Sequence, residues 1–194
     1  MVTIVTGTTN KPTASEAVKQ FFQTHSEIDG YLYIGYPIIG TVDGAYPIDA
    51  LLISPEKGIV AFNLIEGKNT NGYEEAQDDC ANKIEAKLKG YKQLVNKRTL
   101  CVDIYVITFA PGLARCPEHD DDYPLCVNAY ELESNLSQCT WTDNSHYSKV
   151  VSVLQAISSI RKGKKKRDDR NRLFSVLAST YFPGPSPAKY FRHE

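Results

Sequence analysis

The sequence predicts an α/β fold in which a small mixed central β-sheet is flanked by helices. Segments with helical apolar spacing alternate with runs rich in β-branched and aromatic residues, in the order helix, several strands, long helix, strand and further helices. Hydrophobic residues make up 42% of the 194 residues, which is enough for the core of one domain.

The first half of the chain contains one expected helix followed by strands. Residues 15–25 have an amphipathic helical pattern, which Thr13 or Ser15 can cap. A β-type run rich in aromatic residues follows at 31–36. The segment 46–68 then reads as a hairpin, because two apolar strands flank a short turn that contains Pro and Gly.

The second half begins with the longest helical pattern, at 73–95. Acids lie toward its start and lysines toward its end, as the helix dipole favours. The run at 100–109 is almost continuously apolar, which predicts a central strand covered on both faces. Shorter helices are expected at 131–136, 148–160 and 169–181. We therefore expect an α/β domain over 1–160, and over 161–194 a basic linker with a C-terminal helical extension.

Composition and charge indicate the cellular compartment of the protein but do not identify a binding partner. Lys and Arg number 22 against 23 Asp and Glu, so the overall charge predicts neither nucleic-acid nor membrane binding. No segment approaches the ~20 apolar residues of a membrane span, and the N-terminus lacks the pattern of a secretory signal. The five cysteines are irregularly spaced, which fits reduced thiols. We expect a cytoplasmic protein without a membrane partner.

The hairpin at 46–68 has the layout of a metal-dependent nuclease site. Asp49 opens its first strand, and Glu66 and Lys68 close the second strand. Phosphodiester cleavage needs hard oxygen ligands for Mg²⁺ and a group that positions the attacking water. Acidic and basic groups at the end of a hairpin are suited to both tasks.

Strand register argues against that literal interpretation. With the turn centred near Glu56, the residue across from Asp49 is close to Asn63. Glu66 lies three residues further on, so its side chain should point to the opposite face of the sheet. A β-bulge, which adds one residue to a strand, would restore the alignment.

The same hairpin resembles the NERD (nuclease-related) branch of the PD-(D/E)xK, or restriction-endonuclease-like, group. The residues that carry the resemblance are Ile48-Asp49, Leu51-Leu52-Ile53-Ser54, Gly58-Ile59-Val60 and Phe62. The resemblance implies a restriction-endonuclease-like fold in which Asp49 is the metal ligand. When the chain is aligned on Gly58, Asn63 takes the place of the metal-binding acid and Ile65 that of the lysine.

The likeness extends over about residues 15–160. The chain is similar there to the nuclease-like region that precedes the motor of some bacterial superfamily 1 helicases of the UvrD/Rep type, which implies an accessory domain whose partners are DNA and a helicase motor in the same or a partner chain. The sequence has no Gly-x-x-x-x-Gly-Lys-Ser/Thr motif, so the motor is expected outside these residues. The segments that carry the likeness are 30–37, 76–79, 87–94 and 104–111.

Three functions stay open at this point. The first is a catalytically degenerate nuclease-like domain that binds nucleic acid or partner domains, with no certain cofactor. The second is an active Mg²⁺-dependent DNA nuclease that uses Asp49, Glu66 and Lys68, with Asn63 and Glu16 as further site residues. The third is a protein-interaction domain without nucleic-acid contact.

Charged and metal-binding side chains elsewhere suggest further sites. Cys116, His119, Cys126 and Cys139 are zinc-ligand types, but their intervals match no common zinc motif, so buried or loop thiols are favoured. The acidic run 120–122 is expected to be a solvated loop. The basic run is either a site for nucleic-acid phosphates or a solvated linker between helices. Its members are Lys162, Lys164, Lys165, Lys166, Arg167, Arg170 and Arg172.

Overall fold

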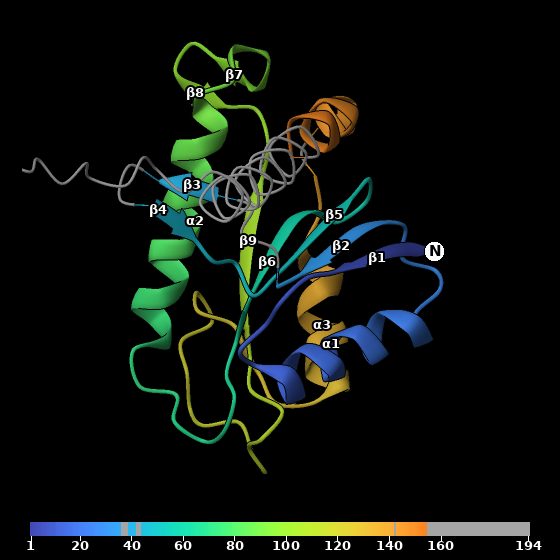
Figure 1. Ribbon diagram of the computed structural model, residues 1–194, viewed down its shortest axis with the longest axis vertical. Helices are drawn as coiled ribbons and strands as arrows, with labels where there is room; N and C mark the ends of the chain where they lie inside the picture. The colour runs from blue at the N-terminus through green and yellow to red at the C-terminus, as the bar shows by residue number, and fades with distance from the viewer. Residues whose placement is uncertain (36–38, 42–43, 142, 155–194) are drawn as a thin grey trace, which may run out of the picture. The chain divides into compact units, whose positions relative to one another are not determined.

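A mixed sheet runs through the part of the chain that the computed structural model describes, which comprises residues 1–35, 39–41, 44–141 and 143–154 (Figure 1). Its strand order is β1-β2-β5-β6-β9-β10. The pairs β1/β2, β6/β9 and β9/β10 are parallel, whereas β2/β5 and β5/β6 are antiparallel. The strands are β1 (Val2–Thr6), β2 (Gly30–Ile34), β5 (Ala50–Ser54), β6 (Gly58–Leu64), β9 (Ile104–Phe109) and β10 (Leu125–Cys126).

Helices cover both faces of this sheet, which confirms the predicted mixed α/β class. In Figure 1, α2 (Tyr73–Lys89) lies on one side of the sheet, and α1 (Pro12–Thr24) and α3 (Ala129–Gln138) lie on the other. Two small hairpins lie outside the main sheet. Their strands are β3 (Ile39–Thr41) with β4 (Gly44–Tyr46), and β7 (Val95–Asn96) with β8 (Thr99–Leu100).

Alternation of side chains along β5 and β6 produces two separate cores. Phe62 and Leu64 point into the core beneath α1 and α3, with Phe22 of α1 packed edge-on against Phe62. Leu51 and Ala61 point into the other core, beneath α2. The face on which a side chain lies therefore follows from its parity along the strand, and this decides what each residue of the hairpin can contact.

The β5–β6 hairpin has the register that the sequence predicts. Ser54 pairs with Gly58 and Ala50 with Phe62, so the turn is centred on Glu56. The Ser54 hydroxyl accepts hydrogen bonds from the backbone N–H groups of Glu56 and Lys57, which closes the turn. Gly58 has a φ of 83°, a conformation that glycine adopts without steric cost.

Some expected elements have different bounds. The helix expected at 15–25 begins at Pro12, and neither Thr13 nor Ser15 caps it through its side chain. Proline at the first helical position explains the earlier start, because its missing N–H has no partner there in any case. Strand β1 was not predicted, since five alternating residues at a terminus carry little periodic signal.

The helix expected at 73–95 ends at Lys89, because Gly90 follows and the chain continues into the short 3-10 helix η1 (Lys92–Leu94). The strand expected at 100–109 divides into β8 and β9. Ile104, Tyr105 and Val106 are only half-buried, because β10 pairs with the last two residues of β9 alone. Coverage on both faces was therefore wrong for the start of β9.

The C-terminal expectations fall mostly outside the described residues. Helix α3 is longer than the expected 131–136, and a helix that begins at Tyr147 is described as far as Leu154. The boundary at residue 160, the helix at 169–181 and the basic run lie beyond this point. Within the described residues, the helices are too short or too polar to cross a bilayer.

Candidate functional site

Asp49 lies just before the start of β5, next to the outermost pair of the hairpin. That pair is Ala50 with Phe62, so continuing the same register outward would place Asp49 across from Asn63. Both lie two residues from a side chain of the α2-side core, so both belong to that face of the sheet. The backbone carbonyl of Asp49 accepts a hydrogen bond from Gly35 N–H at 2.7 Å, which fixes the position of this residue against the end of β2.

A lysine from another element neutralises Asp49. Its Oδ2 atom accepts a hydrogen bond from Lys11 Nζ at 2.7 Å and another from the backbone N–H of Leu64 at 2.9 Å. The Lys11 and Asp49 side chains are 28% and 16% exposed, so water screens this pair less than it screens a surface pair. The backbone N–H of Lys11 donates to Thr9 Oγ1, which positions the lysine just before α1. We call this contact the Lys11–Asp49 pair.

Asn63 belongs to a polar network that extends away from the hairpin. Its Nδ2 atom donates to Thr108 Oγ1 on β9 at 3.3 Å. The same hydroxyl accepts a hydrogen bond from Gln77 Nε2 of α2 at 2.8 Å, and Gln77 also donates to the Pro124 carbonyl at 3.0 Å. Thr108 and Gln77 are buried. Asn63 thus helps to join β6, β9 and α2, and it brings no charge to the site.

Glu66 is hydrogen-bonded to the start of α1, on the α1 side of the sheet. Strand β6 ends at Leu64, and the two carboxylate oxygens of Glu66 accept hydrogen bonds from the backbone N–H groups of Thr13 and Ala14, each at 3.0 Å. These hydrogen bonds, that from Ala14 first, lower the pKa of Glu66. Glu66 therefore supplies the N-terminal cap that Thr13 and Ser15 do not provide, and it lies on the α1 side, as strand parity predicts.

The two remaining residues of the expected catalytic set are on the surface. Lys68 is exposed in the turn after β6. Glu16 forms an ion pair with Lys19, 3.2 Å away on the exposed side of α1. The structure thus bonds Asp49 to Lys11, Asn63 to Thr108 and Glu66 to the start of α1, and it leaves Lys68 and Glu16 on the surface.

A polar cleft of about 390 Å³ lies at the end of β6, between the starts of α1 and α2. Lys11, Asn63 and Glu66 contribute to its wall, together with Tyr73 of α2. The hydroxyl of Tyr73 is buried and has no hydrogen-bond partner among the described residues. Burial raises the pKa of Tyr73, so this hydroxyl stays protonated near neutral pH. Further amide groups in the wall come from Asn10, Asn69 and Asn71.

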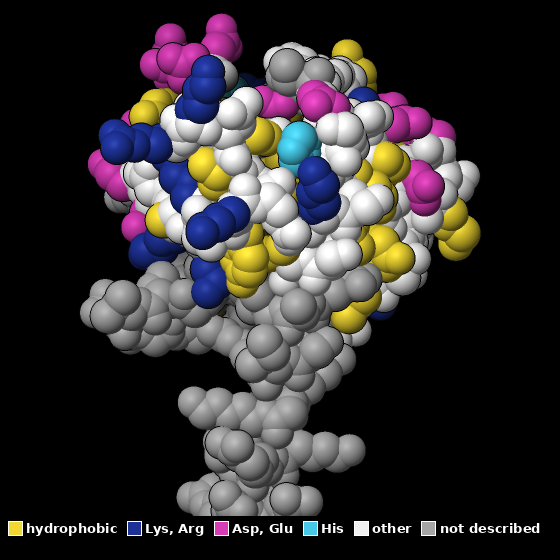
Figure 2. Space-filling model, turned by 90° about the horizontal axis from the view of Figure 1, so that it is seen from above, with side chains coloured by type: hydrophobic (Ala, Val, Ile, Leu, Met, Phe, Trp, Pro, Cys, Tyr) yellow, Lys and Arg dark blue, Asp and Glu magenta, His cyan; other side chains and the backbone are white. Residues whose placement is uncertain are grey.

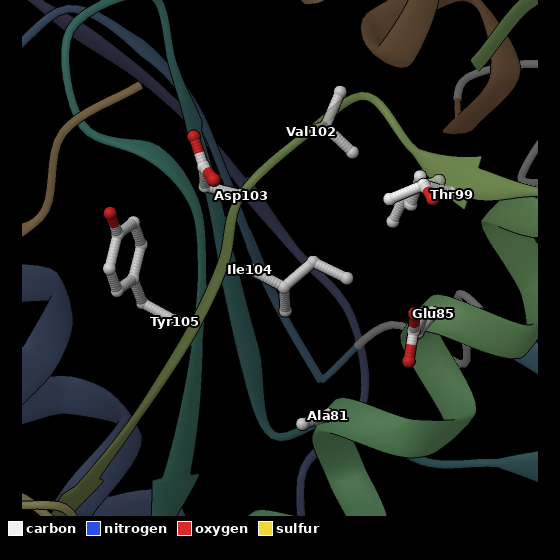
Figure 3. Close-up of a pocket in the computed structure, with 8 residues that line it drawn as sticks. Ala81, Glu85, Thr99, Val102, Asp103, Ile104 and Tyr105 are labelled. Atoms are coloured by element: carbon white, nitrogen blue, oxygen red, sulfur yellow. The ribbon is translucent and has the colours of Figure 1, made fainter. Parts of the chain in front are cut away.

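A second hollow, of about 340 Å³, lies near the start of β9 (Figure 3). Ile104 points toward Ala81 and Glu85 of α2, while Tyr105 lies on the other side of the strand (Figure 3). The Tyr105 hydroxyl donates to the Thr140 carbonyl at 2.7 Å. The wall of this second hollow combines apolar side chains with the carboxylates of Glu85 and Asp103, and none of its lining residues is a lysine or an arginine.

The described residues contain no group of three or more His, Cys, Asp and Glu side chains placed to hold a metal ion. Cys126 and Cys139 are buried, and burial raises the pKa values of their thiols to about 12 and about 11. Cys116 lies 3.5 Å from His119 Nδ1 in a loop, and its thiol also donates to the Leu125 carbonyl. Asp120–Asp122 forms an exposed turn in which Asp120 Oδ1 accepts the Asp122 N–H.

Two residues that bond to the side chains of the candidate site or its network, Lys11 and Gln77, were missed by the sequence reasoning. Lys11 is separated from Asp49 by 38 positions, and no local pattern links the two. Gln77 lies at a buried position of α2, where a polar residue on the apolar stripe was the available signal. The predicted nucleic-acid-binding residues from Lys162 to Arg172 lie outside the described part of the chain.

Searches of protein-family models, of curated proteins and of solved structures each find no match to this chain.

Proposed function

We propose that this chain is a restriction-endonuclease-like domain that has lost its nuclease chemistry and serves a DNA-processing protein, such as a superfamily 1 helicase, as a nucleic-acid-binding accessory domain. The proposal rests on the hydrogen-bond partners of the Asp49 carboxylate. The expected metal ligand is instead bonded to the Lys11 ammonium group and to the backbone of Leu64.

Charge explains why this arrangement disfavours a divalent cation. Mg²⁺ is held by several hard oxygen ligands, commonly including carboxylates. Asn63 is neutral, Glu66 is hydrogen-bonded to the start of α1, and the positive charge that Asp49 attracts is supplied by Lys11. A metal ion would have to displace a lysine at 2.7 Å and would gain only one carboxylate. The Lys11–Asp49 pair therefore takes the place of a metal centre.

Calorimetric titration with Mn²⁺ tests this proposal. The wild-type chain is expected to show no saturable binding at millimolar Mn²⁺. The variant Lys11→Met/Asn63→Glu removes the internal cation and adds a carboxylate opposite Asp49, so it is expected to gain binding. Adding Asp49→Asn to that variant should abolish the gain. Saturable binding by the wild type that is lost in Asp49→Asn would overturn the proposal.

The active nuclease remains the second candidate because Glu66, Lys11 and Asn63 line one cleft. In that case Glu66 would have to leave the N-terminus of α1 to join Asp49. Replacing Glu66 by Ala would then abolish divalent-metal binding together with DNA cleavage. In the degenerate domain the same change affects only stability.

The nucleic-acid part of the proposal is supported by the basic run after residue 160. Clustered cations bind phosphates at long range and with steep salt dependence. Neutralising Lys164, Lys165 and Lys166 is therefore expected to weaken DNA binding most at low salt. An absence of DNA binding by the wild type at low salt would favour the protein-interaction domain.

A further inference from the structure

A second concentration of cations lies within the folded part of the chain. Between residues 80 and 100 the sequence has six Lys and Arg against a single Glu. These residues occupy the last turns of α2, the η1 segment and the β7–β8 hairpin. The six cations are Lys83, Lys87, Lys89, Lys92, Lys97 and Arg98.

Four of these cations have no ion-pair partner among the described residues. Lys89 lies 2.6 Å from Glu85, and Lys83 is paired with Asp79. Within the described residues, no carboxylate lies within 4.0 Å of the remaining four. Figure 2, which looks onto the β7–β8 end of the molecule, shows Lys and Arg side chains gathered on one part of this face. We call the four residues the hairpin cation surface: Lys87, which is half-buried, and the exposed Lys92, Lys97 and Arg98.

The backbone at the hairpin tip is unusual for the residues that it carries. Lys97 and Arg98 have φ values of 47° and 79°, in the left-handed region. Two-residue turns with positive φ at both central positions favour Asn-Gly, because other side chains are strained there. Lys97 and Arg98 therefore do not stabilise this turn. Strained backbone positions of this kind are found most often at functional sites.

The hairpin is held firmly to the domain. Leu94 is fully buried just before β7, and its carbonyl accepts a hydrogen bond from the Cys101 N–H at 2.8 Å. Val95 pairs with Leu100 and Asn96 with Thr99. The two tip cations thus project from a short, anchored hairpin next to the end of α2.

We propose that the hairpin cation surface binds the phosphate backbone of a nucleic acid. Lysines in the last turn of a helix are explained by the helix dipole, but Lys97 and Arg98 lie beyond the helix and have no such role. Arginine and lysine are the side chains that position a protein on phosphates. The inference rests on the proposed nucleic-acid-binding function and places a contact on the folded domain, separate from the basic run.

An anionic membrane fits this surface less well than a nucleic acid does. Stable attachment to a membrane needs an apolar or lipid anchor beside the basic residues. Among the described residues, the exposed large hydrophobic side chains are Met1 and Tyr130, which belong to other elements. Phosphates on a nucleic acid need only the clustered cations themselves.

The variant Lys97→Asn/Arg98→Gly tests this proposal. It removes both tip cations and introduces the residues that this type of turn prefers, so the thermal melting temperature should stay the same or rise. The matched control is Lys19→Ala/Arg115→Ala, which removes one Lys and one Arg from α1 and from the loop after β9. Fluorescence anisotropy of the full chain with labelled 20-nucleotide single strands and 20-base-pair duplexes measures binding at several salt concentrations.

The tip variant is expected to bind at least about tenfold more weakly than the wild type at low salt, and its salt slope should be shallower by roughly 2, close to 0.9 for each lost phosphate contact. The control should bind like the wild type. Equal affinity of the tip variant and the wild type would overturn the proposal, as would equal losses in the two variants. Binding to phosphatidylserine vesicles without binding to either nucleic acid would assign the surface to membranes instead.

These outcomes are distinct from those that test the proposed function. The tip variant keeps the basic run from Lys162 to Arg172 and the Lys11–Asp49 pair intact. If neutralising Lys164, Lys165 and Lys166 abolishes DNA binding while the tip variant binds DNA normally, the proposed accessory function is supported and the proposal for the hairpin cation surface is wrong.

Discussion

Removing either partner of the Lys11–Asp49 pair is expected to destabilise the domain in a coupled way. Lys11→Met removes the ammonium group and keeps most of the apolar stem. Asp49→Asn removes the negative charge, while its side-chain oxygen can still accept the Leu64 N–H hydrogen bond. The double variant Lys11→Met/Asp49→Asn leaves neither charge without a partner, so its loss should be smaller than the sum of the single losses.

The burial of the pair sets the size of the effect. Exposed ion pairs contribute about 0–1 kcal/mol, whereas breaking a buried pair costs about 3–5 kcal/mol. With side chains 28% and 16% exposed, this pair lies between these limits, so we expect each single change to cost about 2 kcal/mol. The double change should cost about 3 kcal/mol, which gives a coupling of about 1 kcal/mol.

Urea unfolding followed by tryptophan fluorescence measures these free energies. Trp141 is the only tryptophan of the sequence, and its indole N–H donates to the Ser54 carbonyl at the end of β5, so it reports on the hairpin that contains the site. Lys19→Met is the matched control, because Lys19 pairs with the exposed Glu16, and it should change stability by less than about 0.5 kcal/mol. Additivity of the two single changes within about 0.3 kcal/mol would refute the reasoning.

Three further changes test other parts of the account. Thr108→Val should cost about 1–3 kcal/mol in urea unfolding, because it removes the buried hydroxyl that accepts hydrogen bonds from Asn63 and Gln77; a cost below about 0.5 kcal/mol would contradict this role. Glu66→Ala should lower the melting temperature at neutral pH. Because folding lowers the pKa of Glu66, its stabilisation is present above the ordinary value of 4.5 and is lost as the pH falls through the folded value, so the difference between wild type and variant should shrink as the pH falls below 4.5. The thiol of Cys80, whose pKa burial raises to about 12, should resist iodoacetamide at about pH 8 in the folded protein and react once the protein is unfolded, as mass spectrometry would show; rapid alkylation of the folded form would contradict its burial.

The sequence was sufficient for the hairpin because its information there is local. The Pro-Glu-Lys-Gly turn fixes the register, and the period of two then determines the face of each residue. This reasoning placed Asn63 opposite Asp49, and it placed Glu66 on the other face. The printed register ends one position short of the first placement, at the pair Ala50 and Phe62, and Glu66 contacts the start of α1 as the second placement requires.

What the sequence could not supply are contacts between distant elements. Lys11 reaches Asp49 only because the start of α1 and the start of β5 meet in the folded domain. The cap of α1 was missed for the same reason, since Glu66 replaces the local side chains Thr13 and Ser15. The end of α2 depended on Gly90, and the partial exposure at the start of β9 depended on the short β10. Propensity averaged over a long segment resolves neither feature.

The proposed absence of metal chemistry at the hairpin is tested most directly by DNA cleavage. Labelled single- and double-stranded DNA would be incubated with Mn²⁺ or Mg²⁺ and either the wild type or Asp49→Ala. The Lys11–Asp49 pair predicts that the wild type cleaves no faster than the Asp49→Ala background. Divalent-metal-dependent cleavage by the wild type that disappears in Asp49→Ala would contradict the account.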